Sequence, residues 1–138
     1  MKPLALLCSD THLRRDKFDT FFAFTQIIDK AIALQIPIIG AGDLLDKQTN
    51  RAETVVFLAE ELKRLAEENL KFYYTQGQHE LDTVPWMQVA SNAVHMHKQL
   101  FEFGEYAAYG LDWQPFGTLQ MELEDVPTRT DLLVCHQV

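Results

Sequence analysis

The chain has 138 residues, of which 47% are hydrophobic and 23% are charged, and its formal net charge is −8. This length fits one domain with a real core, and this composition excludes a disordered or fibrous chain. The acidic excess disfavours a broad nucleic-acid footprint, because non-specific binding to phosphates depends on Lys and Arg.

Compartment and membrane contact follow from two further features of the sequence. No apolar run approaches the roughly 20 residues of a membrane span, so we expect no contact with a membrane. Cys8 and Cys135 each lie in an apolar run, which predicts buried free thiols in a reducing compartment. We therefore expect the protein in the cytoplasm.

Apolar runs alternate with helical periodicity along the first half of the chain. Buried strands are predicted at residues 3–10, 36–43 and 70–77, because each is a nearly continuous apolar run with a polar end. Between them, residues 16–35 form a helix whose face toward the sheet begins with the apolar residues Phe18, Phe21, Phe22 and Ile28. A second helix starts at a capping box formed by Asn50 and Glu53, and its apolar face carries Val55, Leu58, Leu62 and Leu65.

The second half of the chain carries shorter predicted elements. A short helix from Pro85 to about Ala90 precedes strands within 106–113, 118–124 and 131–137, with turns at 112–117 and 124–130. Strands and helices that alternate with short connections imply right-handed crossovers and a largely parallel sheet. The sequence therefore predicts one α/β domain over residues 1–138.

Polar side chains follow each of the first three predicted strands. They are Asp10 and His12 after the first strand, Asp43 and Asp46 after the second, and Gln78, His79 and Glu80 after the third. Any one group fits an ordinary loop, turn or cap. Together they predict one site, because the carboxyl ends of parallel strands meet at one edge of the sheet. Carboxylates combined with imidazoles suit Mn²⁺, Fe²⁺ or Zn²⁺ better than Mg²⁺ or Ca²⁺.

Four short motifs carry a resemblance to a known family. SDTHL, GDLLD, GQHE and the later VCHQ resemble the D-x-H, G-D-x-x-D, G-N-H-[DE] and later His motifs of the calcineurin-like metallophosphoesterases. The resemblance spans nearly the whole chain. It implies a layered α/β sheet with flanking helices, a metal site at the strand carboxyl ends, and hydrolysis of phosphate esters by two divalent ions.

The resemblance also implies a role for each matching residue. Asp43 would bridge the two ions, with Asp10 and His12 on the first ion and with residues 78 and 136, here Gln78 and His136, on the second. The catalytic His79 would bind no metal, but would lie beside the scissile phosphate to stabilise charge or protonate the leaving oxygen. Mn²⁺ is the expected ion, with Fe²⁺, Zn²⁺ and Mg²⁺ as alternatives.

Within the superfamily, the sequence is similar to the branch of the SbcD-type DNA exonuclease subunits. Leu13 follows the motif histidine, and GDLLD leads directly into a helix, as in that branch. The likeness implies a DNA exonuclease or endonuclease subunit that acts on DNA ends, with a coiled-coil ATPase as partner and a homodimer left open. Protein serine/threonine phosphatases carry Arg-Gly after the second motif, where this chain has Lys47 and Gln48.

Three alternatives remain open at this point: a small-substrate phosphatase, a cyclic-nucleotide phosphodiesterase, and a degenerate, non-catalytic scaffold with the same fold. Two departures from the family pattern bear on them. Gln78 replaces the family asparagine, and the family G-H-x-H motif does not follow His136. We expect the chain to be truncated before that motif, or naturally short, and the second ion to bind weakly. His95 and His97 precede His136, and we expect them to be ordinary histidines on a strand face.

Overall fold

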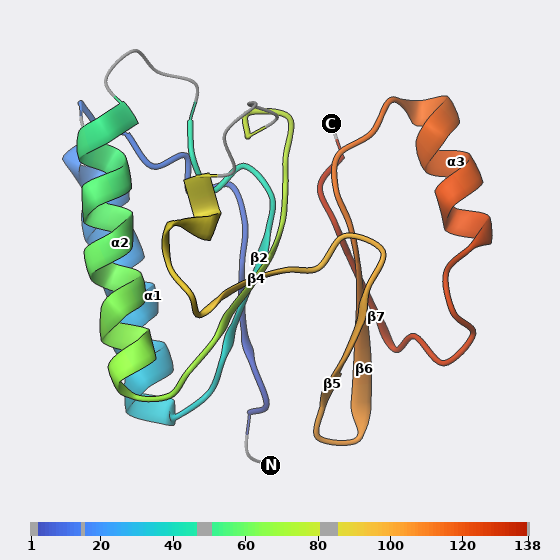
Figure 1. Cartoon of the computed structure of the whole chain (residues 1–138), viewed down its shortest axis with the longest axis horizontal. Helices are drawn as coiled ribbons and strands as arrows, with labels where there is room; N and C mark the ends of the chain where they lie inside the picture. The colour runs from blue at the N-terminus through green and yellow to red at the C-terminus, as the bar shows by residue number, and fades with distance from the viewer. Residues whose placement is uncertain (1–2, 15, 47–50, 81–85, 138) are drawn as a thin grey trace.

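The computed structural model describes residues 3–14, 16–46, 51–80 and 86–137, and these residues form an α/β fold (Figure 1). The elements in chain order are β1 (Leu6–Cys8), α1 (Phe18–Leu34), β2 (Ile38–Ala41), α2 (Arg51–Glu67), β3 (Phe72–Thr75), the 3-10 helix η1 (Trp86–Val89), β4 (Ala93–His95), β5 (Leu100–Phe103), β6 (Tyr106–Leu111), α3 (Phe116–Glu124) and β7 (Leu132–Cys135). The predicted order of strands and helices in the first half of the chain is confirmed.

The strands form two sheets. The first has the order β1-β2-β3-β4 and is parallel throughout, with Ile38 of β2 paired to Leu6 on one side and to Phe72 on the other. The second has the order β5-β6-β7, in which β5 and β6 are antiparallel and β6 and β7 are parallel. The parallel first sheet agrees with the prediction, whereas β5 was not predicted.

The sheets and helices pack in four layers (Figure 1). Helices α1 and α2 cover one face of the first sheet, and fully buried side chains such as Phe24, Leu58 and Phe72 fill the space between them. A smaller apolar cluster, which includes Ile39 and Val134, joins the two sheets, and α3 covers the outer face of the second.

The apolar face of α1 differs from the prediction. Phe18 and Phe22 are 77% and 68% exposed, whereas Phe24, Ile28 and Ala31 are fully buried. At 100° per residue, Phe24, Ile28 and Ala31 fall on one narrow stripe, and Phe18 and Phe22 lie well away from it. The prediction is therefore confirmed for Ile28 and Phe21, which pack in or against the core, and wrong for Phe18 and Phe22.

The segment predicted as a strand at residues 118–124 is the helix α3. Its alternation of polar and apolar residues favoured a strand, but over seven residues that pattern cannot be told from a helix with one buried stripe. In the structure Leu119 and Glu122, three residues apart, are the buried side chains of the helix. Leu, Gln, Met and Glu are also good helix formers, so local propensity and packing agree.

Some smaller expectations can be compared with the structure. Cys8 and Cys135 are free thiols that are partly buried, and burial raises the pKa of Cys8 to about 12. Among the described residues, no helix has the length and apolar character required to cross a membrane. Asn50 and Pro85, the predicted helix starts, lie outside the described residues.

Candidate metal centre

Side chains from four strands meet at the carboxyl edge of the first sheet. Asp10 and His12 follow β1, Asp43 follows β2, His79 follows β3, and His136 follows β7 of the second sheet. The loops after β1 and β2 run side by side, because Asp10 and His12 donate backbone hydrogen bonds to the carbonyl oxygens of residues 42 and 43 at 3.1 and 3.0 Å. The parallel sheet therefore brings together residues that are up to 126 positions apart in sequence.

Asp10, Asp43 and His136 form the first of two groups that could hold a metal ion, which we call triad 1. The His136 ring lies between the two carboxylates, with Nε2 3.2 Å from Asp43 Oδ2 and Nδ1 3.8 Å from Asp10 Oδ1. Asp43 and His136 are buried, whereas Asp10 is exposed on the open side. His12 joins this edge, with its Nε2 3.9 Å from Asp10 Oδ1.

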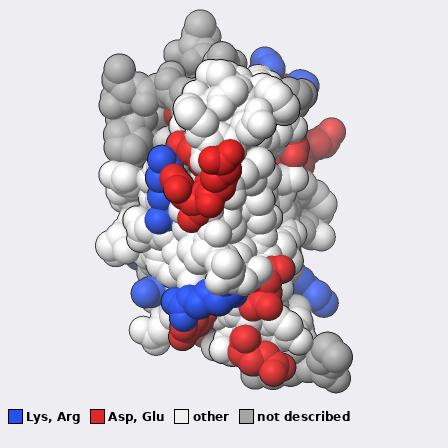
Figure 2. All heavy atoms as spheres, turned by 90° about the vertical axis from the view of Figure 1, so that its right-hand side faces the viewer, with Lys and Arg blue, Asp and Glu red and all other residues white. Residues whose placement is uncertain are grey.

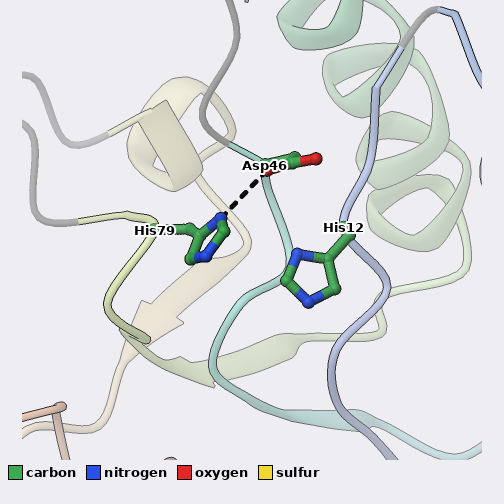
Figure 3. A group of neighbouring side chains, drawn as sticks. All are labelled: His12, Asp46 and His79. Carbon is green, nitrogen blue, oxygen red and sulfur yellow. Dashed lines mark hydrogen bonds and ion pairs between the residues drawn. The ribbon is translucent and has the colours of Figure 1, made fainter.

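The second group, triad 2, consists of His12, Asp46 and His79 (Figure 3). His79 Nδ1 lies 2.9 Å from Asp46 Oδ1, as the dashed line shows. Because an ionised carboxylate only accepts hydrogen bonds, Nδ1 carries the hydrogen and Nε2 is left to face the centre. There Nε2 lies 3.9 Å from Asp43 Oδ2, and the His79 ring meets the edge of the His12 ring at a centroid distance of 5.0 Å.

Arg14 holds the far oxygen of Asp46. Its Nη1 lies 2.9 Å from Asp46 Oδ2, and its Nε and Nη2 bind Asp16. Burial alone would raise the pKa of Asp46, but the hydrogen bonds from His79 and Arg14 outweigh burial and hold that pKa below its ordinary value. Asp46 thus stays ionised and keeps His79 in one tautomer.

The backbone at this edge adopts unusual conformations. Asp10, His12 and Asp43 have positive φ angles of 53°, 42° and 48°. Such conformations in residues other than glycine cost about 1–3 kcal/mol each, and they cluster at functional sites. They turn three site residues out of line with their strands, so that the side chains face one another.

Glycine is required at Gly77 for steric reasons. A Cβ atom there would lie 2.0 Å from Asp43 Oδ1 and 2.3 Å from the Asp43 backbone nitrogen. Asp43 Oδ1 instead accepts a hydrogen bond from the backbone N–H of His79 at 3.0 Å. The loops after β2 and β3 thus lie in direct contact, and that contact fixes the orientation of the Asp43 carboxylate.

Glu80 links the same two loops through hydrogen bonds to their backbone. Its carboxylate is 3% exposed and accepts hydrogen bonds from the backbone N–H groups of Leu44, Leu45 and Gly77 at 2.7, 2.9 and 2.9 Å. Burial raises the pKa of Glu80 to about 7 although these three hydrogen bonds favour the ionised form. Glu80 therefore stabilises the loops that carry the site residues and does not face the open edge.

The structure brings five of the six predicted site residues together: Asp10, His12, Asp43, His79 and His136. The sixth, Gln78, lies in the same loop as His79, but its amide makes no hydrogen bond to any other described residue. Sequence reasoning did not assign the roles of Asp46 and Arg14. Asp46 belongs to the GDLLD motif and could have been found there, whereas nothing in the sequence pairs it with Arg14.

The side chains of triad 1 fit a divalent cation. Nε2 of His136 is buried and makes no hydrogen bond with a described residue, because its approach to Asp43 Oδ2 lacks hydrogen-bond geometry. A buried imidazole nitrogen without a partner, next to a buried carboxylate oxygen, is the pair of donors that Mn²⁺, Fe²⁺ or Zn²⁺ binds. Triad 2 is a poorer candidate, because both oxygens of Asp46 already bind His79 and Arg14.

Comparison with known proteins gives one informative similarity. No protein-family model matches the chain. The chain is 28% identical over 150 aligned positions to the DNA double-strand break repair protein Mre11 of Methanosarcina mazei, and the alignment covers 94% of this chain. It covers 24% of that protein, so the chain spans about a quarter of the length of the relative that it matches. At this identity the similarity supports a relationship at the level of the superfamily that the motifs resemble, and no closer one.

Proposed function

We propose that this chain forms the metal centre of a phosphodiester hydrolase that acts on DNA. The observation that carries the proposal is triad 1, where a buried imidazole nitrogen without a hydrogen-bond partner lies 3.2 Å from a buried carboxylate oxygen. In the proposed centre Asp43 would hold both ions, Asp10 and His12 would hold the first, and Gln78 and His136 would hold the second. Divalent ions held there would supply Lewis-acid stabilisation of the phosphate ester and activation of the attacking water.

His79 acts on the substrate in this proposal. Its Nδ1–H is held by Asp46, and its Nε2 faces the same space as the Asp43 carboxylate at 3.9 Å. An imidazole in that position can give a proton to the leaving oxygen or stabilise the charge that develops on the phosphate. The hydrogen bond from Arg14 to Asp46 supports this role. It occupies Asp46 Oδ2, so that Asp46 orients His79 through Oδ1 and has no free oxygen for an ion.

DNA is the proposed substrate on two grounds. The motifs resemble the nuclease branch of the metallophosphoesterases, and the similar protein of Methanosarcina mazei is named for repair of DNA double-strand breaks. On the face that carries α3, basic and acidic side chains lie interspersed, and the described residues form no continuous basic band there (Figure 2). DNA would therefore engage the chain at the ions of the centre and not across that face.

The resemblance supplies the remaining parts of the proposal. Mn²⁺ is the proposed ion, with Fe²⁺, Zn²⁺ and Mg²⁺ as alternatives. A coiled-coil ATPase is the proposed partner, and a homodimer is a further possible assembly. The proposed location, the cytoplasm, rests instead on the two free thiols Cys8 and Cys135.

A comparison of substrates tests the proposal. With Mn²⁺, we expect the chain to cleave labelled linear duplex DNA slowly and to leave a cyclic nucleotide and a phosphopeptide unchanged. A chelator should abolish the cleavage, and so should Asp43→Asn, whereas Asp131→Asn at an unrelated carboxylate should not. Faster hydrolysis of either small substrate would favour a phosphatase or phosphodiesterase. Failure of the Mn²⁺-loaded chain to hydrolyse any of the three would favour a scaffold.

A further inference from the structure

Asp112 lies just beyond the end of β6, next to the candidate centre but outside both triads. Its carboxylate is 6% exposed, and its two oxygens lie 2.9 and 2.8 Å from Nε2 of His95. Oδ1 also accepts the backbone N–H of Gln76 at 2.7 Å, and the backbone N–H of Asp112 donates to Nδ1 of His97 at 3.0 Å. The two histidines expected to be ordinary strand residues thus both contact Asp112, His95 at its carboxylate and His97 at its backbone N–H.

The hydrogen bonds of Asp112 and its neighbour fix the start of the loop that follows β3. The N–H of Gln76 is bound by Asp112, and its carbonyl oxygen accepts the backbone N–H of Trp113 at 2.7 Å. The next residue is Gly77, which packs so closely on Asp43 that an added Cβ would lie 2.0 Å from Asp43 Oδ1. Gln78 and His79 follow directly. They therefore continue from a residue, Gln76, whose N–H and carbonyl oxygen are both hydrogen-bonded to the segment that follows β6.

The geometry indicates positioning and not a further metal site. Nδ1 of His97 already accepts the N–H of Asp112, so this nitrogen is not available to an ion shared with His95. Nε2 of His95 donates to the carboxylate, and the His95 ring stacks on Tyr74 at a centroid distance of 5.0 Å. A buried carboxylate is costly unless every acceptor is used, and here His95 and Gln76 use both oxygens.

We infer that Asp112, held in place by His95, is a positioning residue for the candidate centre. It fixes the backbone of Gln76 and so sets where the amide of Gln78 and the imidazole of His79 point. The inference rests on the proposed function. Gln78 depends most on this support, because its amide has no hydrogen bond to another described residue and its longer side chain has more freedom than the family asparagine.

The test uses two variants of Asp112 and a matched control. Asp112→Ala removes the acceptor for Gln76. Asp112→Asn keeps a carbonyl oxygen for Gln76, while its amide group can donate to the other tautomer of His95. Asp131→Ala removes a carboxylate that makes the same kind of bond at the opposite end of β6, where it accepts the N–H of Ala107 at 2.8 Å. Two quantities are measured: Mn²⁺ affinity by calorimetry, and amide hydrogen exchange of the metal-free protein.

We expect Asp112→Ala to lower Mn²⁺ affinity roughly 10–100-fold, the usual effect of losing a group that orients ligands. Exchange of the Gly77 and His79 amides should become faster in the same variant. Asp112→Asn should recover most of both losses, and Asp131→Ala should match the wild type. A purely structural role would lower thermal stability in both alanine variants without a selective change at the loop.

Each contrary outcome bears on a definite claim. Wild-type affinity and wild-type exchange in Asp112→Ala would overturn the inference, and so would an equal loss in Asp131→Ala. Absence of Mn²⁺ binding in the wild type would count against the proposed function, and the exchange rates of the metal-free protein would still decide whether Asp112 fixes the loop. If Asp112→Ala does not fold, Asp112→Asn and His95→Ala replace it. His95→Ala should speed exchange of the Gly77 and His79 amides selectively, but by less than the loss of Asp112 would. Wild-type exchange in His95→Ala would refute the role given to His95.

Discussion

Substitution of Gly77 by alanine should damage the candidate centre through a single methyl group. The added Cβ would lie 2.0 Å from Asp43 Oδ1, where ordinary contacts lie between 3.4 and 4 Å, so the Asp43 carboxylate must move by more than 1 Å. Overpacking of this kind costs about 1–3 kcal/mol of stability. The displaced carboxylate also loses its hydrogen bond from the His79 N–H, so Mn²⁺ affinity should fall roughly 10–100-fold.

Gly117→Ala is the matched control for Gly77→Ala. Gly117 lies in α3, and a Cβ atom there has nothing within 4 Å. Removing a helical glycine should leave stability unchanged or raise it by up to about 1 kcal/mol. Urea denaturation measures the free energy of unfolding of both variants, and calorimetry measures Mn²⁺ affinity. Equal stability of the two variants, together with wild-type affinity in Gly77→Ala, would refute the contact between Gly77 and Asp43.

Two further substitutions test separate parts of the site. His79→Ala should lower the rate of DNA cleavage by roughly 10²–10⁴ without changing the number of Mn²⁺ ions bound, because the proposed role of His79 is to act on the substrate and not to bind an ion. Loss of an ion in this variant would show that His79 is a metal ligand. Glu80→Ala should lower the free energy of unfolding by about 3 kcal/mol or more in urea denaturation, because three buried N–H groups each lose an acceptor worth about 1–3 kcal/mol. A loss below about 1 kcal/mol would show that water or other groups replace the carboxylate.

The first sheet and its polar edge could be predicted because their signals are local. Continuous apolar runs that end in polar residues identify β1, β2 and β3, and the rule that parallel strands share a carboxyl edge brings Asp10, Asp43 and His79 together. His136 was reached only through the family resemblance, because β7 belongs to a second sheet whose place against the first cannot be read from periodicity.

The remaining errors came from features that depend on packing. The buried stripe of α1 is decided by where the helix meets the sheet, so Phe18 and Phe22 were misplaced. Asp112 follows a predicted strand just as Asp10 and Asp43 do, and that signal could have selected it. Its partner His95 could not be predicted, because the pairing depends on how the chain crosses from the first sheet to the second.

The most direct test of the central claim is a calorimetric titration of the metal-free chain and of Asp43→Asn with Mn²⁺. The account predicts that the wild type binds one ion well and a second more weakly, because Gln78 is a less suitable ligand than asparagine. Asp43→Asn should lose most of the affinity for both ions while its thermal denaturation stays close to that of the wild type. Failure of the wild type to bind Mn²⁺, or unchanged binding by Asp43→Asn, would contradict a metal centre at this edge of the sheet.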